Sequence, residues 1–196
     1  MKTIVISIRP EWAREILNRH KTIEVRRGLA LYNALKKAED NGEEAEFHMY
    51  VTKDKKNLLV EASSDRLGEW FATIAPNHKE TIPGFVEIGE PLNGMVVARF
   101  KAKAETIKYH NHRNLDDWDG YCIDRGEKIG IGEIELCESS CLNHRQLDDY
   151  LQEKDGTAIR IRDIKVFDKP KTIADYGLKR APQSWCYAKE AKNESA

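Results

Sequence analysis

A short basic segment near the N-terminus contains the side chains with the clearest chemical potential. Lys21, Glu24 and Arg26 occur as Lys-x-x-Glu-x-Arg, and Arg27 follows directly. A guanidinium can hold a phosphate through two hydrogen bonds, an ammonium adds a compact positive charge, and a carboxylate can act as a general base. The segment therefore predicts either phosphate binding or hydrolysis by water. A third interpretation is structural, with Glu24 paired to Lys21 or Arg26 as an ion pair.

The distribution of charge supports a local patch. Residues 1–27 contain seven Lys/Arg and three Asp/Glu, a balance of +4, whereas the remaining residues contain 25 basic and 30 acidic side chains, a balance of −5. The net charge of −1 argues against a protein that coats nucleic acid through a global positive field. Specific contacts to a few phosphates fit this pattern better.

The cysteine content and the N-terminus predict a cytoplasmic protein without a membrane span. The apolar run Ile4–Ile8 ends at Arg9-Pro10 and is too short for a signal or transmembrane segment. Four cysteines are too few for a disulfide framework in a chain of 196 residues, and they occur at Cys122, Cys137, Cys141 and Cys186.

Alternating and helical spacings of apolar residues predict the elements that must position this chemistry. Strands are expected at 3–8, 21–27, 47–52, 95–104, 158–167 and 184–188, and helices at 10–19, 29–40 and after Asn143. In the segment 21–27, Thr22, Glu24 and Arg26 share one strand face. In 158–167 the polar face carries Arg160 and Arg162. Residues 53–93 are expected to leave the main sheet, with a short helix at 65–74, and 108–135 is unassigned.

The order of a strand, a helix opened by Pro10 and then Lys-Thr-Ile-Glu-Val-Arg resembles the start of the ASCH domain family, a branch of the PUA-like superfamily. The resemblance implies one domain over 1–190, insertions at 54–93 and 105–140, and a charged tail at 191–196. Many short strands with few short helices also favour the α+β class and a small PUA-like β-barrel with flanking helices. Further blocks resembling prophage-type members lie at 47–53, 94–100, 157–170 and 182–187.

The resemblance implies, as the first function, a nucleic-acid or nucleotide-binding module, most naturally for RNA, with a basic cleft. Phosphates would meet Lys21, Thr22, Arg26 and Arg27. An unpaired base could stack on Trp185, and Gln183 and Ser184 could read its edge. Trp12 could also stack, although its place on the apolar side of a helix favours the core.

The alternative is a small amidohydrolase-like enzyme that acts on a modified nucleoside. Some short ASCH proteins are similar in this segment and cleave acetylated cytidine nucleosides with a lysine, a threonine three residues later and a distant glutamate. Lys21 matches the lysine, but Glu24 stands in place of the threonine nucleophile. Hydrolysis would therefore require Lys21 and Glu24 to activate water.

The sequence predicts neither a metal site nor a cofactor. Cys137, Cys141 and His144 lie close together, and Cys-x₃-Cys suits half of a zinc site, but His110 and His112 are too close in sequence for the other half. If Cys137 ends a strand and Cys141 precedes a helix cap, both are buried apolar residues. Phosphate-loop and dinucleotide motifs are absent. A protein partner at 54–93 and the oligomeric state stay open.

Overall fold

The computed structural model describes residues 2–64, 70–76, 85–88, 90–110, 120–124 and 132–189. The chain divides into two compact units, which are described separately below. The terminal unit contains Met1–Arg19, Glu46–Lys101 and Asp163–Ala196, and the central unit contains His20–Ala45 and Ala102–Arg162. The single domain over 1–190 stays a prediction, and the expected tail at 191–196 lies outside the described residues.

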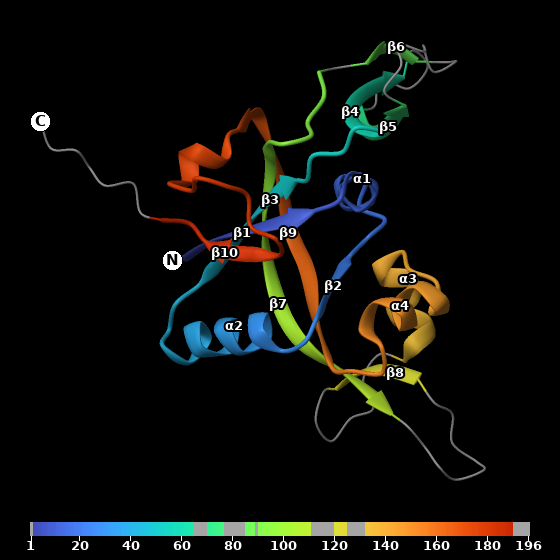
Figure 1. Ribbon diagram of the computed structural model, residues 1–196, viewed down its shortest axis with the longest axis vertical. Coiled ribbons are helices and arrows are strands. Elements are labelled where there is room, and N and C mark those ends of the chain that lie inside the picture. Colours follow the sequence, from blue (N-terminus) through green and yellow to red (C-terminus); the bar gives the residue numbers. More distant parts are fainter. Residues whose placement is uncertain are drawn as a thin grey trace, which may run out of the picture. The chain divides into compact units, whose positions relative to one another are not determined.

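The terminal unit is built on β1 (Lys2–Ile8) and β3 (Ala45–Val51). β1 runs antiparallel beside β10 (Trp185–Tyr187) (Figure 1). Ile6 lies opposite Trp185 in this pair. β3 pairs in the same sense with β7 (Val96–His110), and the rings of Phe47 and Phe100 stack with centroids 5.3 Å apart. The alternation that predicted these strands places their large apolar side chains in the core, namely Ile4, Ile6, Ile8, Phe47, Met49 and Phe100.

A second, three-stranded sheet occupies the predicted excursion within the terminal unit. β4 (Asn57–Ser64) is central, with β5 (Trp70–Pro76) and β6 (Phe85–Ile88) antiparallel on either side. The predicted helix at 65–74 is wrong for 70–74, because the aromatic and β-branched residues there form β5; residues 65–69 lie outside the described part. Asn18, after α1 (Pro10–Leu17), exchanges two 2.9 Å hydrogen bonds with the Ala72 backbone.

The central unit packs two helices against the β2–β9 pair. β2 (Ile23–Arg27) runs antiparallel to β9 (Gly156–Lys171), with Ile23 opposite Arg160 and Val25 opposite Ala158. β8 (Gly120–Asp124) pairs with the end of β7. The hydrophobic core joins these strands to the helices through Ile23, Val25, Ile107, Tyr121, Ile123, Leu136, Cys137, Leu147, Leu151 and Ala158.

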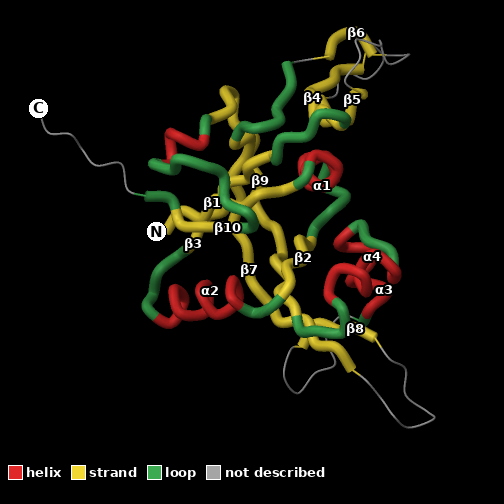
Figure 2. Tube along the Cα trace, viewed as in Figure 1, coloured by secondary structure: helices red, strands yellow, loops and turns green. Residues whose placement is uncertain are grey.

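The helices of the central unit are α2 (Ala30–Asp40), α3 (Glu133–Ser140) and α4 (His144–Leu151), and α3 lies beside α4 in Figure 2. The predicted start of α4 is confirmed: the Asn143 side chain accepts from Gln146 N, and the Gln146 side chain accepts from Asn143 N, both at 2.9 Å. The expectation that Cys137 ends a strand is wrong, because Cys137 lies inside α3.

Within the described residues, the principal sheet has seven strands in the order β10-β1-β3-β7-β9-β2, with β8 on β7. β7 and β9 are long enough to contribute residues to both units. A sheet of this size with a few short helices confirms the predicted α+β class. None of the described helices is long and apolar enough to cross a membrane.

Candidate functional site

The central unit brings together three of the predicted site residues in a buried cluster, the Lys21 cluster. The Glu24 carboxylate lies between two cations, with Oε2 3.4 Å from Lys21 Nζ and Oε1 3.1 Å from Arg26 Nη2. The three side chains are 2%, 9% and 12% exposed for Lys21, Glu24 and Arg26. Both ion pairs of the structural interpretation are therefore formed, and they lie out of water.

The ammonium of Lys21 is also bound to the end of α3. Lys21 Nζ donates to the Ser140 carbonyl at 2.5 Å, and Thr22 N donates to the Ser139 carbonyl at 2.8 Å. A cation at a helix C-terminus meets carbonyls that lack partners within the helix, and the helix dipole favours it there. Lys21 thus fastens α3 to the start of β2. The hydrolase alternative requires Lys21 and Glu24 to meet a substrate, and the geometry favours the structural role instead.

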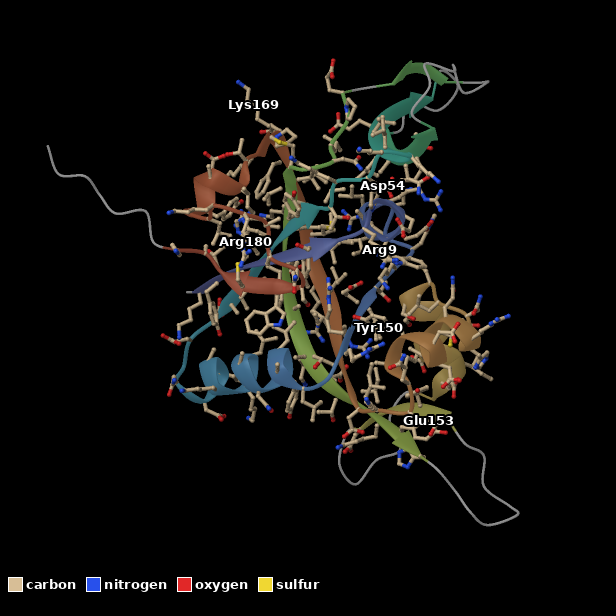
Figure 3. The ribbon with its side chains drawn as sticks, in the orientation of Figure 1. Arg9, Asp54, Tyr150, Glu153, Lys169 and Arg180 are labelled. Carbon is tan, nitrogen blue, oxygen red and sulfur yellow. The ribbon has the colours of Figure 1, made fainter. Side chains whose placement is uncertain are left out.

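Two other predicted residues lie at the surface of the central unit. Arg27 is exposed; its Nε donates to the Tyr150 carbonyl at 2.7 Å, and its guanidinium lies 5.5 Å from the centroid of the Tyr150 ring (Tyr150 is labelled on α4 in Figure 3). Thr22 is exposed, and its carbonyl accepts from Ile161 N at 2.9 Å. These two remain accessible for the predicted phosphate contacts.

The predicted base-reading residues belong to the terminal unit. The Ser184 carbonyl accepts from Ser7 N at 2.9 Å, and the Trp185 ring stands perpendicular to Tyr187 at 5.8 Å. Gln183 is exposed, and Trp185 is partly buried. That these residues share one cleft with Lys21 stays a prediction.

A pocket of about 510 Å³ lies elsewhere in the central unit and is not lined by the Lys21 cluster. Arg160 in its wall pairs with Glu105 at 3.1 Å, and Lys103 and Arg162 are exposed. Arg160 and Arg162 were expected on one strand face without a functional role, because no local pattern shows that β7 and β9 are neighbours. The full lining is Tyr32, Lys103, Ala104, Glu105, Thr106, Asp124, Arg160 and Arg162.

A buried hydrogen-bonded network in the terminal unit was also missed. His48 Nε2 lies 2.9 Å from Glu46 Oε2, His48 Nδ1 lies 2.7 Å from the Tyr176 hydroxyl, and Arg99 Nη1 lies 2.7 Å from Glu46 Oε1. Burial, with the charges of Lys171 and Arg99, lowers the pKa of His48 despite the hydrogen bond to Glu46. The neutral ring therefore accepts from Tyr176 and donates to Glu46.

The same network fixes the ionisation of its acidic members. Burial works to raise the pKa of Glu46, but the hydrogen bonds from His48 and Arg99 and the charge of Arg99 outweigh it and lower that pKa. Burial raises the pKa of Tyr176 to about 12. The folded state thus holds a carboxylate, a neutral imidazole and a neutral phenol side by side.

We expect this network to make the folded protein sensitive to acid. A histidine whose pKa is lowered on folding stabilises the fold fully above the unfolded pKa of 6.5, and this stability declines as pH falls below it, because the unfolded chain takes up the proton first. Glu46, with its pKa below 4.5, adds a second loss at lower pH. Urea denaturation of wild type between pH 7 and 5 should show a falling free energy of unfolding, by at most about 1.4 kcal/mol per pH unit for one proton.

The matched comparison is His48→Gln against His20→Gln, because His20 is exposed. His48→Gln should flatten the dependence between pH 7 and 5, whereas His20→Gln should leave it unchanged. An identical slope in wild type and His48→Gln would contradict the assignment.

No protein-family model and no curated protein matches the chain. Among solved structures, ASCH from Zymomonas mobilis aligns over 96% of this chain and 89% of that chain, with 16% identity and a TM-score of 0.51. The Y47F mutant of that protein aligns over 97% and 92%, with 15% identity and a TM-score of 0.50. At this identity the likeness concerns the fold, and it confirms the predicted α+β, PUA-like architecture: the chain has an ASCH-type fold.

Proposed function

We propose that the chain is a nucleic-acid-binding module that takes single-stranded RNA into the pocket of the central unit. The observation that carries this proposal is the pocket lining, in which exposed Lys103 and Arg162 lie in the same cavity as the aromatic ring of Tyr32. The ASCH-type fold supports it as an analogy of architecture.

The lining suits a nucleotide chemically. The guanidinium of Arg162 can grip a phosphate with two hydrogen bonds, and Lys103 adds a positive charge. Tyr32 offers a face on which an unpaired base can stack. Asp124 and Glu105 are acceptors for the amino groups of a base, and their charge opposes the binding of a phosphate at their own positions. Bases are accessible in this way in single strands and not in duplex RNA.

The basic segment contributes to this function in two ways. Lys21 fastens the end of α3 to the start of β2, and Arg26 pairs with Glu24 on the same strand. Thr22 and Arg27 are proposed to contact the backbone of the same strand of RNA. Gln183, Ser184 and Trp185 are proposed as base contacts within the terminal unit. A reducing cytosol is the proposed location, and all four cysteines, which lie in the described part of the chain, are outside disulfides.

Titration of a labelled single-stranded RNA of mixed sequence, followed by fluorescence anisotropy at low and moderate salt, tests the proposal. Lys103→Ala/Arg162→Ala should weaken binding about tenfold or more and reduce the salt dependence, since each lost phosphate contact removes about 0.7 from the logarithmic slope. Thr22→Ala/Arg27→Ala tests the predicted segment in parallel. Lys154→Ala, an exposed lysine of the same unit outside the pocket lining, is the matched control.

Three results would reject the pocket as the RNA site. One is undetectable binding by wild type at low salt. Another is equal affinity in wild type and Lys103→Ala/Arg162→Ala. The third is an equal loss in Lys154→Ala, which would indicate attraction without a defined site.

A further inference from the structure

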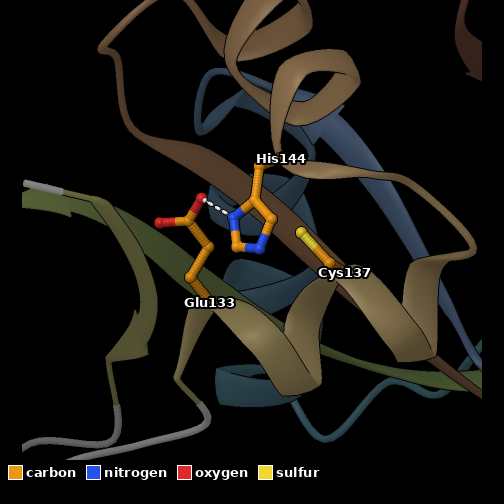
Figure 4. Close-up of side chains that lie close together, drawn as sticks. All are labelled: Glu133, Cys137 and His144. Carbon is orange, nitrogen blue, oxygen red and sulfur yellow. Dashed lines mark hydrogen bonds and ion pairs between the residues drawn. The ribbon is translucent and has the colours of Figure 1, made fainter.

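Two neighbouring helices of the central unit bring three metal-ligating side chains together. Glu133 and Cys137 are four residues apart on α3 and therefore share one helix face, and His144 is the first residue of α4. Their ligand atoms all lie within 4.8 Å of one another, and Glu133 Oε1 is 2.7 Å from His144 Nδ1 (Figure 4). Glu133, Cys137 and His144 belong to none of the sites described above, which are the Lys21 cluster, the RNA pocket and the His48 network.

Each side chain of the trio is held in position by its surroundings. The second oxygen of Glu133 accepts from Tyr121 N at 2.9 Å, which orients the first toward His144. Cys137 is 7% exposed and belongs to the hydrophobic core of the unit. The backbone on either side of the α3–α4 turn is fixed, since Leu142 N donates to the Cys137 carbonyl at 3.0 Å and Asn143 caps α4. An outer hydrogen bond that orients a ligating carboxylate is a recurring property of metal sites.

We propose that Glu133, Cys137 and His144 form a Zn²⁺-binding site with a fourth position open to water. A thiolate, an imidazole and a carboxylate are the three ligand types that zinc takes in proteins, and three protein ligands with one open position is a known arrangement. The sulfur ligand disfavours Mg²⁺ and Ca²⁺, which prefer oxygen. The two anionic ligands together neutralise a divalent cation.

The dimensions of the trio agree with this assignment. Ligand atoms around one tetrahedral zinc lie roughly 3.3–3.8 Å apart, given bonds of about 2.0–2.3 Å. The ligand atoms of the trio lie within 4.8 Å of one another, so the wider pairs need a contraction of about 1 Å at most. The hydrogen-bonded pair of Glu133 Oε1 and His144 Nδ1, at 2.7 Å, must instead separate by about 0.6 Å or more, and both changes are within reach of side-chain rotation. The His144 side chain is 65% exposed, so an ion can enter from solvent and retain a water molecule on that side.

A cysteine, a histidine and a carboxylate are also the components of a thiol hydrolase. A nucleophilic sulfur must reach the carbonyl carbon of a substrate, however, and Cys137 is almost fully enclosed by core side chains. A bare ion needs much less room than a substrate. The enclosure therefore favours a metal over a covalent intermediate.

Metal-free full-length protein, titrated with zinc in competition with a chromogenic chelator, gives the affinity directly. We expect one zinc per chain in wild type. We also expect an affinity loss of more than about 100-fold in both Cys137→Ser and His144→Ala, since loss of a mere outer partner already costs 10–100-fold. Cobalt should give a thiolate-to-metal absorption band that Cys137→Ser abolishes. His144→Ala keeps the test valid if Cys137→Ser fails to fold, because the His144 side chain is exposed.

Cys141→Ser and Glu135→Gln are the matched controls: Cys141 is the C-cap directly after α3, Glu135 lies on α3, and neither belongs to the trio. Both should retain wild-type affinity. The proposal is overturned if wild type binds no zinc at micromolar concentration, if Cys137→Ser and His144→Ala bind as wild type does, or if Cys141→Ser loses as much affinity as they do.

Discussion

Replacement of Lys21 by methionine is expected to lower the free energy of unfolding by about 3 kcal/mol or more, because it removes one partner of a buried ion pair. Methionine keeps the length of the stem, so the change concerns the charge. Among the described residues, the Glu24 carboxylate, 9% exposed, would keep its ion pair with Arg26 alone. The Ser140 carbonyl would lose its donor from Lys21 Nζ. Urea denaturation followed by circular dichroism measures the loss.

The matched control for this experiment is Lys36→Met. Lys36 also pairs with a carboxylate, Asp40 at 2.9 Å, but its side chain is 51% exposed and water replaces the partner at little cost. Lys36→Met should therefore be almost silent. If the two methionine variants were equally stable, the Lys21 cluster would have no special role in holding α3.

Gly156→Ala is expected to destabilise the fold by about 1–3 kcal/mol, through overpacking rather than loss of a contact. A Cβ on Gly156 would lie 2.8 Å from Leu151 Cδ2 and 3.0 Å from the Arg26 carbonyl oxygen. Leu151 is fully buried and the Arg26 oxygen belongs to the β2 backbone, so neither can easily give way. The new methyl group would press β2 and β9 apart where they begin to pair.

Gly132→Ala is the control for the added methyl group, because no atom of the described residues lies within 4 Å of a Cβ at Gly132. Gly132 is the N-cap of α3 and makes no side-chain capping bond, so the cost of alanine is limited to its weaker preference for that position, at most about 1 kcal/mol. Thermal and urea denaturation of the two variants should separate them clearly. Equal midpoints would show that the Gly156 site relaxes without strain.

Elements with strong local patterns were predictable from the sequence. The alternation of Ile4, Ile6 and Ile8 gave β1, and Asn143 with Gln146 gave the start of α4, because both patterns are complete within one element. α3 lacks such a pattern. Its N-cap, Gly132, offers no side-chain oxygen, and its apolar Ile134 is 69% exposed while Leu136 is buried.

The candidate sites were less predictable, because they depend on which elements become neighbours. The strand pattern placed Glu24 on a polar face but gave no sign that this face is buried, since the compensating Lys21 comes from outside β2 and its second partner from α3. Because α3 was not predicted, the four-residue spacing of Glu133 and Cys137 could not be interpreted as two positions on one helix face. The pocket needed residues from α2, β7, β8 and β9, which no local pattern connects.

The attachment of Lys21 to the end of α3 also has a consequence for covalent chemistry. An acylating or alkylating agent needs the lone pair of an accessible amine, and the amine of Lys21 is enclosed between a helix carbonyl and a carboxylate. It can react only in moments when the last turn of α3 detaches from β2. The rate at which this one amine is modified is therefore set by local opening of the helix end. For exposed lysines such as Lys36, the rate is set by the chemical reaction with the reagent.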